Sequence, residues 1–255
     1  MKHPNRRRAF RRFTSSLAIA AGAVAFAGST APADAGLMID LRPTSVNGAV
    51  LPRGTHDVTV APGDVVTVQV VAVVSGANNV NDEGFQSIHG AIRSSTGGLL
   101  LDMTGSFVTA PFNGNGAQNG SSVDSDADGD LDIGGPVIGP GNTFFIPRAN
   151  TVETNGTPIA GANPAAEEFV LGGFTFTVTG TSGELFITFI RRANPNGSDN
   201  IAYSGWVEDG VPHNGLSPYT VRPIVVGPEP GSATLLAAAA SVGLLARRRG
   251  RGQQT

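Results

Sequence analysis

The stretch that decides the fold is residues 174–190, FTFTVTGTSGELFITFI. From Phe174 to Thr179 every second residue is apolar, and the residues between are threonines. After a turn at Gly180 to Gly183, the alternation continues from Leu185 to Ile190. Because successive side chains of a β-strand point to opposite faces, this period of two predicts two half-buried strands, which we expect to form a hairpin.

A valine-rich region nearer the N-terminus has the same character. Asp57 to Val60 and Val65 to Val74 are β-branched runs separated by the turn Ala61-Pro62-Gly63-Asp64. No part of the body carries an apolar helical stripe of about ten residues, so the sequence predicts an all-β fold of antiparallel strands, a sandwich or a barrel. We expect one β-sandwich domain over residues 36–225. Its further short strands are expected at residues 85–92, 99–103, 107–112, 143–147, 201–206 and 219–225.

Both regions resemble parts of cohesin-like sandwiches. The likeness rests on the valine-rich opening with its Pro-Gly-Asp turn and on the expected hairpin at 174–190. It implies a jelly-roll or cohesin-like arrangement of two sheets, and it carries no motif that would identify a ligand.

Composition and charge exclude several kinds of site. The chain has 255 residues and no cysteine, so disulfides, thiolate metal ligands and a cysteine nucleophile are excluded. The formal net charge of −3 combines two basic ends with an acidic body. Residues 36–228 carry seven arginines, no lysine and 18 acidic residues, a net charge of −11. Such a body repels nucleic-acid phosphates and favours hard cations or basic partners.

The first 35 residues are typical of a secretory signal peptide. A basic segment up to Arg12 precedes the apolar stretch Leu17 to Ala27, and Ala33-Asp34-Ala35 is a cleavage pattern of small residues. This apolar run is too short to cross a bilayer core of about 30 Å. We therefore expect cleavage before Gly36, with a retained amphipathic helix as the alternative. Arg7-Arg8-Ala9-Phe10 also resembles a twin-arginine signal, although general secretion fits the following residues better.

The C-terminal segment 226–255 has the features of a membrane-directed tail. Pro228-Glu229-Pro230 leads into the apolar run Gly231 to Ala246, which stops at Arg247-Arg248-Arg249. The prolines hold the backbone extended, the apolar run favours a helix in lipid, and the arginines favour the cytoplasmic side. At about 1.5 Å per residue this helix would cover roughly 24 Å, which is marginal for permanent anchoring.

The order and spacing of these features resemble the PEP-CTERM sorting tail of exported bacterial proteins. The resemblance implies that a membrane exosortase recognises the Pro-Glu-Pro motif, the transmembrane helix and the three arginines together. It further implies processing near the motif, transient anchoring in the inner membrane, and a final place at the cell surface or in the extracellular matrix. The polar extension Gly252 to Thr255 departs from the family pattern. A plain tail anchor is the alternative.

One segment of the body carries metal-binding chemistry. Acids at positions 1, 3, 5 and 9 of residues 124–135, with glycine at 6, match the EF-hand calcium loop, in which alternating carboxylates converge on one hard cation. The segment resembles calcium loops of dockerins and thrombospondin type 3 repeats. Position 12 is Gly135 instead of a bidentate Glu, so we expect weak Ca²⁺ binding, about 10⁻⁴ to 10⁻³ M. The alternative is a solvated acidic loop. The candidate ligands are Asp124, Asp126, Asp128, Asp130 and Asp132.

Catalytic patterns in the sequence are weak. His56, His89 and His213 are far apart and form no local metal motif. Neither a GxSxG elbow nor a P-loop is present. The carboxylate pairs Glu167-Glu168 and Glu208-Asp209 are interpreted as solvent-facing loop acids rather than as a glycosidase pair.

The remaining candidate is a sugar-stacking platform of Trp206 with Tyr203 and Tyr219, although a lone Trp in a sandwich is more often a packing residue. We therefore expect a non-enzymatic, exported protein of the surface or the biofilm matrix, structural or adhesive in role. Its expected partners are an exosortase-like membrane enzyme and then extracellular polysaccharide or other matrix proteins, with no nucleic acid. The alternatives are a secreted carbohydrate-binding module and, supported only by exposed acids, a secreted hydrolase.

Overall fold

The computed structural model of the protein describes residues 36–95, 99–134, 144–162, 164–180, 183–191, 205–214 and 218–228. All of them belong to one compact unit. The expected signal peptide, Tyr203, Gly135 and the tail beyond Pro228 lie outside the described residues. Within the described part of the chain, no helix is long and apolar enough to span a membrane.

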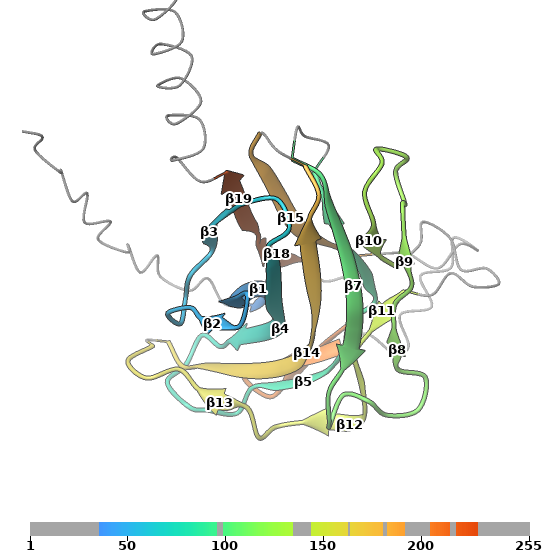
Figure 1. Ribbon diagram of the computed structural model, residues 1–255. Helices are drawn as coiled ribbons and strands as arrows, with labels where there is room; N and C mark the ends of the chain where they lie inside the picture. Colours follow the sequence, from blue (N-terminus) through green and yellow to red (C-terminus); the bar gives the residue numbers. More distant parts are fainter. Residues whose placement is uncertain are drawn as a thin grey trace, which may run out of the picture. The chain divides into compact units, whose positions relative to one another are not determined.

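The first of two large β-sheets is built around three long strands (Figure 1). Seven of the described strands belong to it, in the order β13-β14-β4-β1-β18, with β2 paired to β1 and β7 paired to β14. The long strands β1, β4 and β14 pair antiparallel along most of their length. The bounds of the seven strands are β1 Gly36–Val46, β2 Ala49–Val50, β4 Val65–Ser75, β7 Leu101–Val108, β13 Thr157–Pro158, β14 Ala166–Val178 and β18 Tyr219–Arg222.

The second large sheet contains eight of the described strands, in the order β3-β19-β15-β6-β10-β9, with β11 joining β6 to β8. Their bounds are β3 Asp57–Val60, β6 Gly90–Ser94, β8 Gln118–Asn119, β9 Ser122–Val123, β10 Asp132–Ile133, β11 Phe145–Ile146, β15 Leu185–Arg191 and β19 Ile224–Pro228. A smaller sheet orders four described strands as β12-β5-β16-β17. These are β5 Gly84–Ser87, β12 Arg148–Glu153, β16 Gly205–Glu208 and β17 Val211–Asn214.

One hydrophobic core lies between the two large sheets. Alternate residues of β4 and β14 from the first sheet and of β15 and β19 from the second belong to a single buried cluster. Several residues between them, such as Thr67 and Thr175, are partly exposed, whereas Val71 and Val73 of β4 belong to a second, small buried cluster. Burial of one face of each sheet against the other is the architecture of a β-sandwich. The prediction of an all-β sandwich is therefore confirmed.

The stretch 174–190 forms the two predicted strands but not the expected hairpin. Its first half is the end of β14, which pairs with β4 and β7 in the first sheet. Its second half is β15, which pairs with β6 and β19 in the second sheet. A hairpin would place both apolar faces side by side on one sheet. The chain instead crosses from one sheet to the other, so that Phe176 and Ile187 enter the core from opposite sides.

The prediction of purely antiparallel strands is wrong at the end of the chain. β18 pairs parallel with β1, and β19 pairs parallel with β3. Only Pro223 separates β18 from β19, although they lie in different sheets. Proline has no amide hydrogen and cannot continue a ladder, so the chain leaves one sheet there and enters the other.

Several expected strand limits also differ. The expected strand 85–92 is two strands, β5 and β6, in different sheets. The expected strands 99–103 and 107–112 are joined as β7, which continues through Gly105 in a left-handed conformation (φ 62°). The last strand runs to Pro228, three residues past the expected domain end. Val226 on it is fully buried, and Pro228 pairs with Val60.

Candidate functional site

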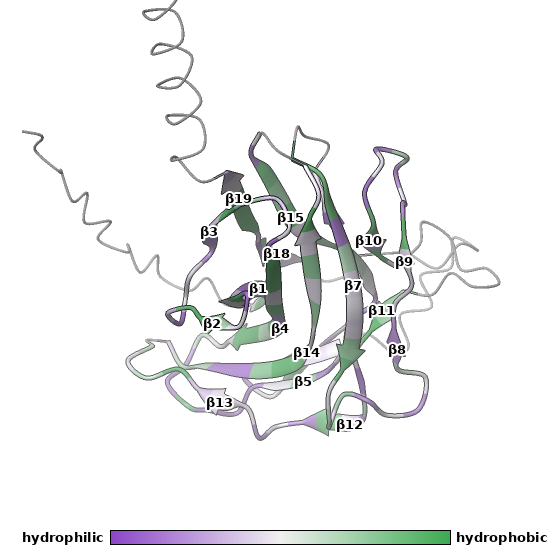
Figure 2. Cartoon of the chain, viewed as in Figure 1, coloured by the Kyte–Doolittle hydropathy of each residue, from purple (hydrophilic) through white to green (hydrophobic). Residues whose placement is uncertain are grey.

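The acidic loop connects β9 to β10, and its residues are largely hydrophilic (Figure 2). Asp124 shapes the turn: its Oδ1 accepts the amide of Ala127 at 2.7 Å and that of Asp128 at 3.2 Å, and its Oδ2 accepts the amide of Gly129 at 3.3 Å. Ala127 and Gly129 both adopt left-handed backbone angles, with φ 63° and 100°. Glycine reaches this conformation without steric cost. The loop therefore turns where the sequence pattern placed its glycine.

Asp130 and Asp132 turn inward from the loop and are 2% and 0% exposed. The hydroxyl of Ser94 on β6 lies 2.9 and 2.8 Å from the two carboxylate oxygens of Asp130. The amide of Ser94 donates to Asp132 Oδ1 at 3.1 Å, and the hydroxyl of Ser125 donates to Asp132 Oδ2. Arg93 Nε is 4.0 Å from Asp132 Oδ2. These contacts fasten the base of the loop to β6.

Burial raises the pKa of Asp130 to about 7, and the charges of Asp128 and Asp132 add to the effect. Burial also raises the pKa of Asp132, against the opposing hydrogen bonds of Ser125 and Ser94. A carboxyl group with a raised folded-state pKa is less favourable when ionised, so its contribution to stability decreases as the pH rises towards that pKa. A cation bound nearby would oppose this effect, because it would stabilise the ionised carboxylates.

The structure brings together three of the five predicted calcium ligands. Carboxylate oxygens of Asp124, Asp126 and Asp128 lie within 4.8 Å of one another. Two oxygens on opposite sides of a Ca²⁺ ion are separated by about 5 Å, so these three carboxylates fit one ion. Asp130 and Asp132 lie beneath this group, engaged with Ser94, and do not belong to it. Gly135, at the twelfth position, lies outside the described residues.

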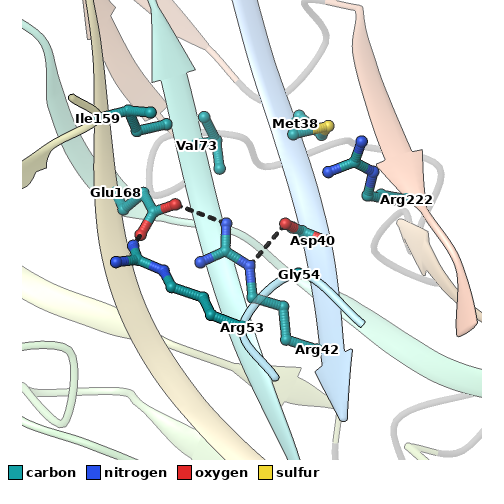
Figure 3. Close-up of a pocket in the computed structure, with 9 residues that line it drawn as sticks. All are labelled: Met38, Asp40, Arg42, Arg53, Gly54, Val73, Ile159, Glu168 and Arg222. Carbon is teal, nitrogen blue, oxygen red and sulfur yellow. Dashed lines mark hydrogen bonds and ion pairs between the residues drawn. The ribbon is translucent and has the colours of Figure 1, made fainter. Parts of the chain in front are cut away.

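A second group of charged side chains lines a pocket of about 230 Å³ (Figure 3). Arg42 on β1 is at its centre: its Nε donates to Asp40 Oδ2 at 2.7 Å, and its Nη2 donates to Glu168 Oε1 at 2.7 Å. Arg53, from the connection between β2 and β3, donates to the other oxygen of Glu168. His56 Nε2 lies 2.7 Å from Asp40 Oδ1. These side chains are the ion-pair network of the first sheet.

The carboxylates of this network are stabilised in their charged form. Burial alone would raise the pKa of Asp40, but the hydrogen bond with His56 and the charge of Arg42 outweigh it and lower the pKa. The pKa of Glu168 is lowered in the same way, with Arg42 and Arg53 outweighing burial. Because both carboxylates already have cationic partners inside the protein, the network fits a structural role better than the binding of a cation.

The other predicted candidates are scattered. Trp206 is 3% exposed and stacks on His213, with ring centroids 5.3 Å apart. A buried indole cannot offer a face to a sugar ring, so Trp206 is a packing residue here. Tyr203 lies outside the described residues, and Tyr219 packs edge-on against Phe189. The sugar platform therefore has no support from Trp206.

The two members of each predicted carboxylate pair have different surroundings. Glu167 and Glu168 lie on β14 instead of in a loop, and because neighbouring strand residues point to opposite faces, only Glu168 reaches the pocket. Glu167 is 3% exposed, so its expected solvent-facing position is wrong. Glu208 Oε2 is 3.4 Å from His213 Nε2, while Asp209 accepts the amide of Ala77. Sequence reasoning gave no role to Ser94 and Ser125, because nothing local connects them with the loop.

The chain is thus an all-β sandwich with an acidic loop and an internal ion-pair network. No protein-family model and no curated protein matches it. Among solved structures it is similar to a chain of the CaDoc0917–CaCohA2 complex, at 12% identity and a TM-score of 0.37 over 76% of this chain and 99% of that one. The seventh ScaB type I cohesin of Pseudobacteroides cellulosolvens shares 11% identity, with a TM-score of 0.36 over 77% and 94%. A type II cohesin of the Acetivibrio cellulolyticus cellulosome shares 12%, with a TM-score of 0.33 over 75% and 95%. At these values the likenesses assign neither a family nor a function.

Proposed function

We propose that this chain is an exported β-sandwich module of the cell surface or extracellular matrix, structural or adhesive in role and delivered by its C-terminal tail. The observation that carries the proposal is the order of features at the end of the chain. β19 ends at Pro228, and the rest of the Pro-Glu-Pro motif, the apolar run and the arginine cluster follow directly. The resemblance of this tail to a sorting signal supports an exosortase-like membrane enzyme as the first partner. The later partners would be extracellular polysaccharide or other proteins of the matrix.

The test of sorting is a truncation immediately after Pro228. This cut leaves β19 complete, including buried Val226 and the pairing of Pro228 with Val60. We expect the truncated protein to lose its membrane-associated precursor and its normal final location, as measured by cell fractionation and by mass spectrometry of both chain ends. Removal of Gly252 to Thr255 alone is the matched control, because that extension is not part of the family pattern. Unchanged processing and location of the truncated protein would contradict the proposal.

We further propose that Asp124, Asp126 and Asp128 bind Ca²⁺ weakly and stiffen the loop. Their mutual spacing and the left-handed turn at Gly129 support this. Asp130 and Asp132 would contribute by charge from beneath the site. Hard carboxylate oxygens with little imposed geometry suit Ca²⁺ better than the smaller Mg²⁺, which requires a near-octahedral site.

Calcium titration tests this site. With a dissociation constant of about 10⁻⁴ to 10⁻³ M, 10 mM Ca²⁺ should stabilise the fold by roughly 1.4 to 2.7 kcal/mol. Asp128→Asn should reduce the calcium-dependent stabilisation by this amount, measured by thermal denaturation in EDTA and in calcium, while Asp57→Asn, an exposed acid on β3, should leave it unchanged. Equal calcium increments in the two variants, or no heat in calorimetry at millimolar Ca²⁺, would exclude the loop site.

The carbohydrate-binding alternative requires a surface other than Trp206. Because that indole is buried, polysaccharide recognition by aromatic stacking would have to use other residues. A pull-down on insoluble polysaccharides tests this alternative: absence of retention would exclude a carbohydrate-binding module and would leave other matrix proteins as the partners of an adhesive module.

A further inference from the structure

A second group of carboxylates lies outside the acidic loop. Asp82 and Glu83 end the connection between β4 and β5, and Asp209 is in the two-residue turn between β16 and β17. Oxygens of the three side chains lie within 4.8 Å of one another. Asp209 and Gly210 have φ of 50° and 73°, the left-handed angles of a type I′ hairpin turn. The turn is held against the β4–β5 connection, because Asp209 Oδ2 accepts the amide of Ala77 at 2.7 Å.

Glu83 is the unusual member of this group. It is 0% exposed, and neither of its carboxylate oxygens accepts a hydrogen bond of normal geometry. Its Oε1 is directed towards the other acids: a Cβ added to Gly76 would overlap both Glu83 Oε1 and Asp209 Oδ1, so the two oxygens lie over the same glycine. Burial of a carboxylate without a partner is strongly unfavourable, and native proteins supply such groups with a counter-charge or a metal.

The surroundings of Glu83 are negative rather than positive. Glu167 on β14 is 3% exposed, and its Oε2 is also without a hydrogen-bond partner. Burial raises the pKa of Glu167, and the charges of Glu83 and Asp82 raise it further. Burial likewise raises the pKa of Glu83 and outweighs the opposing backbone amides of Glu83 and Asp82, while the charges of Asp82 and Asp209 raise it further. Neighbouring Glu168 has two arginine partners, Arg42 and Arg53, but these reach β14 on its other side.

We propose that Asp82, Glu83 and Asp209 form a second divalent-cation site, selective for Ca²⁺, with Glu167 adding negative charge beside it. The site offers only oxygen ligands, which favours a hard cation over a transition metal. Oxygens up to 4.8 Å apart can share one Ca²⁺ ion, whose bonds are about 2.3 to 2.6 Å long. Three carboxylates and coordinated water would meet its need for about six to eight oxygens. The ion would bind the β16–β17 turn to the β4–β5 connection.

The experiment isolates this site from the acidic loop by using the purified full chain with Asp128→Asn. Calorimetric titration with CaCl₂ after EDTA treatment should still show a binding event. Adding Glu83→Gln should weaken that binding at least tenfold and abolish the calcium-dependent rise in melting temperature. The exposed Asp82→Asn should weaken it in the same direction, and Asp57→Asn should leave it unchanged. In EDTA, Glu83→Gln should melt no lower than its parent, because the amide removes a buried charge.

Two results would overturn the proposal. One is the absence of calcium heat in the Asp128→Asn parent, which would leave the loop as the only site. The other is an unchanged isotherm in both Glu83→Gln and Asp82→Asn. The second variant keeps the test decisive if Glu83→Gln does not fold, because Asp82 is exposed and its replacement leaves the core intact.

Discussion

Replacement of Arg42 by Met should destabilise the protein through the ion-pair network of the first sheet. The guanidinium bridges Asp40 and Glu168, whose side chains are 1% and 11% exposed. Removing one partner of a buried ion pair costs about 3 to 5 kcal/mol. Here the lower end applies, since Asp40 keeps His56 and Glu168 keeps Arg53. We expect the free energy of unfolding to decrease by about 3 kcal/mol at pH 7, measured by urea denaturation.

The stability lost in Arg42→Met should also depend on pH, and it should decrease as the pH falls. The network lowers the pKa values of Asp40 and Glu168, so their contribution to stability is complete above their unfolded values of 3.8 and 4.5, decreases as the pH falls below these values, and is lost once the pH is below the lowered values of the folded state. The difference in stability between wild type and Arg42→Met should therefore be full at pH 7 and smaller at pH 3.5. Arg222→Met is the control, since Arg222 lines the same pocket but is exposed (Figure 3). A loss no greater than that of this control, or an equal difference at both pH values, would refute the reasoning.

Three further predictions concern packing and burial. Trp206→Ala should cost about 3 to 5 kcal/mol in thermal denaturation, because the indole is buried; a melting temperature within 1 °C of wild type, on the order of assay error, would contradict this. Gly90→Ala should strongly destabilise, because a Cβ there would overlap the ring of Phe189; Phe189→Leu should recover part of the loss in chemical denaturation. Ser94→Ala should cost about 1 to 3 kcal/mol in EDTA at pH 8, since it leaves Asp130 buried without its hydroxyl partner; Ser95→Ala is the neighbouring comparison.

Much of the strand content could be predicted from local pattern. The alternation at 174–178 and 185–189 depends on one face being buried, and both segments are strands with that face inward. The turn at Ala61 to Asp64 was equally visible, because proline has a fixed φ and no amide hydrogen, and Gly63 adopts the positive φ (91°) that other residues avoid. Each of these patterns lies within a few residues of the strand or turn that it predicts.

Pairing partners could not be predicted, because an apolar face specifies burial and not the strand beside it. β14 and β15 are close in sequence and lie in different sheets, whereas β1 and β18 lie at opposite ends of the body and pair directly. The same limit applies to the second carboxylate group. Asp209 reaches Ala77 across 132 positions, and only the folded chain shows that its charge accumulates beside Glu83.

The acidic loop could be predicted only in part. Its spacing predicted a turn and five candidate ligands; the structure has the turn and brings three of the five carboxylates together. The inward rotation of Asp130 and Asp132 was not visible, because it depends on Ser94 of a distant strand. A local motif therefore predicts how the backbone turns better than it predicts which of its side chains remain available to a ligand.

The body of the protein has too few arginines to neutralise its acidic residues. Residues 36–228 have seven arginines for 18 acids, and Arg42 and Arg53 are both committed to the network around Glu168. Among the described residues, the second carboxylate group consequently has no ion pair with an arginine. The loop is contacted by Arg93, which lies 4.0 Å from Asp132 and donates to the carbonyl of Ser125. A cysteine-free chain cannot join distant segments by disulfides. Calcium from the medium would neutralise both groups and join the segments that carry them. Transfer from calcium to EDTA should therefore lower the melting temperature of the wild-type protein more than that of a variant in which Glu83 and Asp128 are both replaced by their amides.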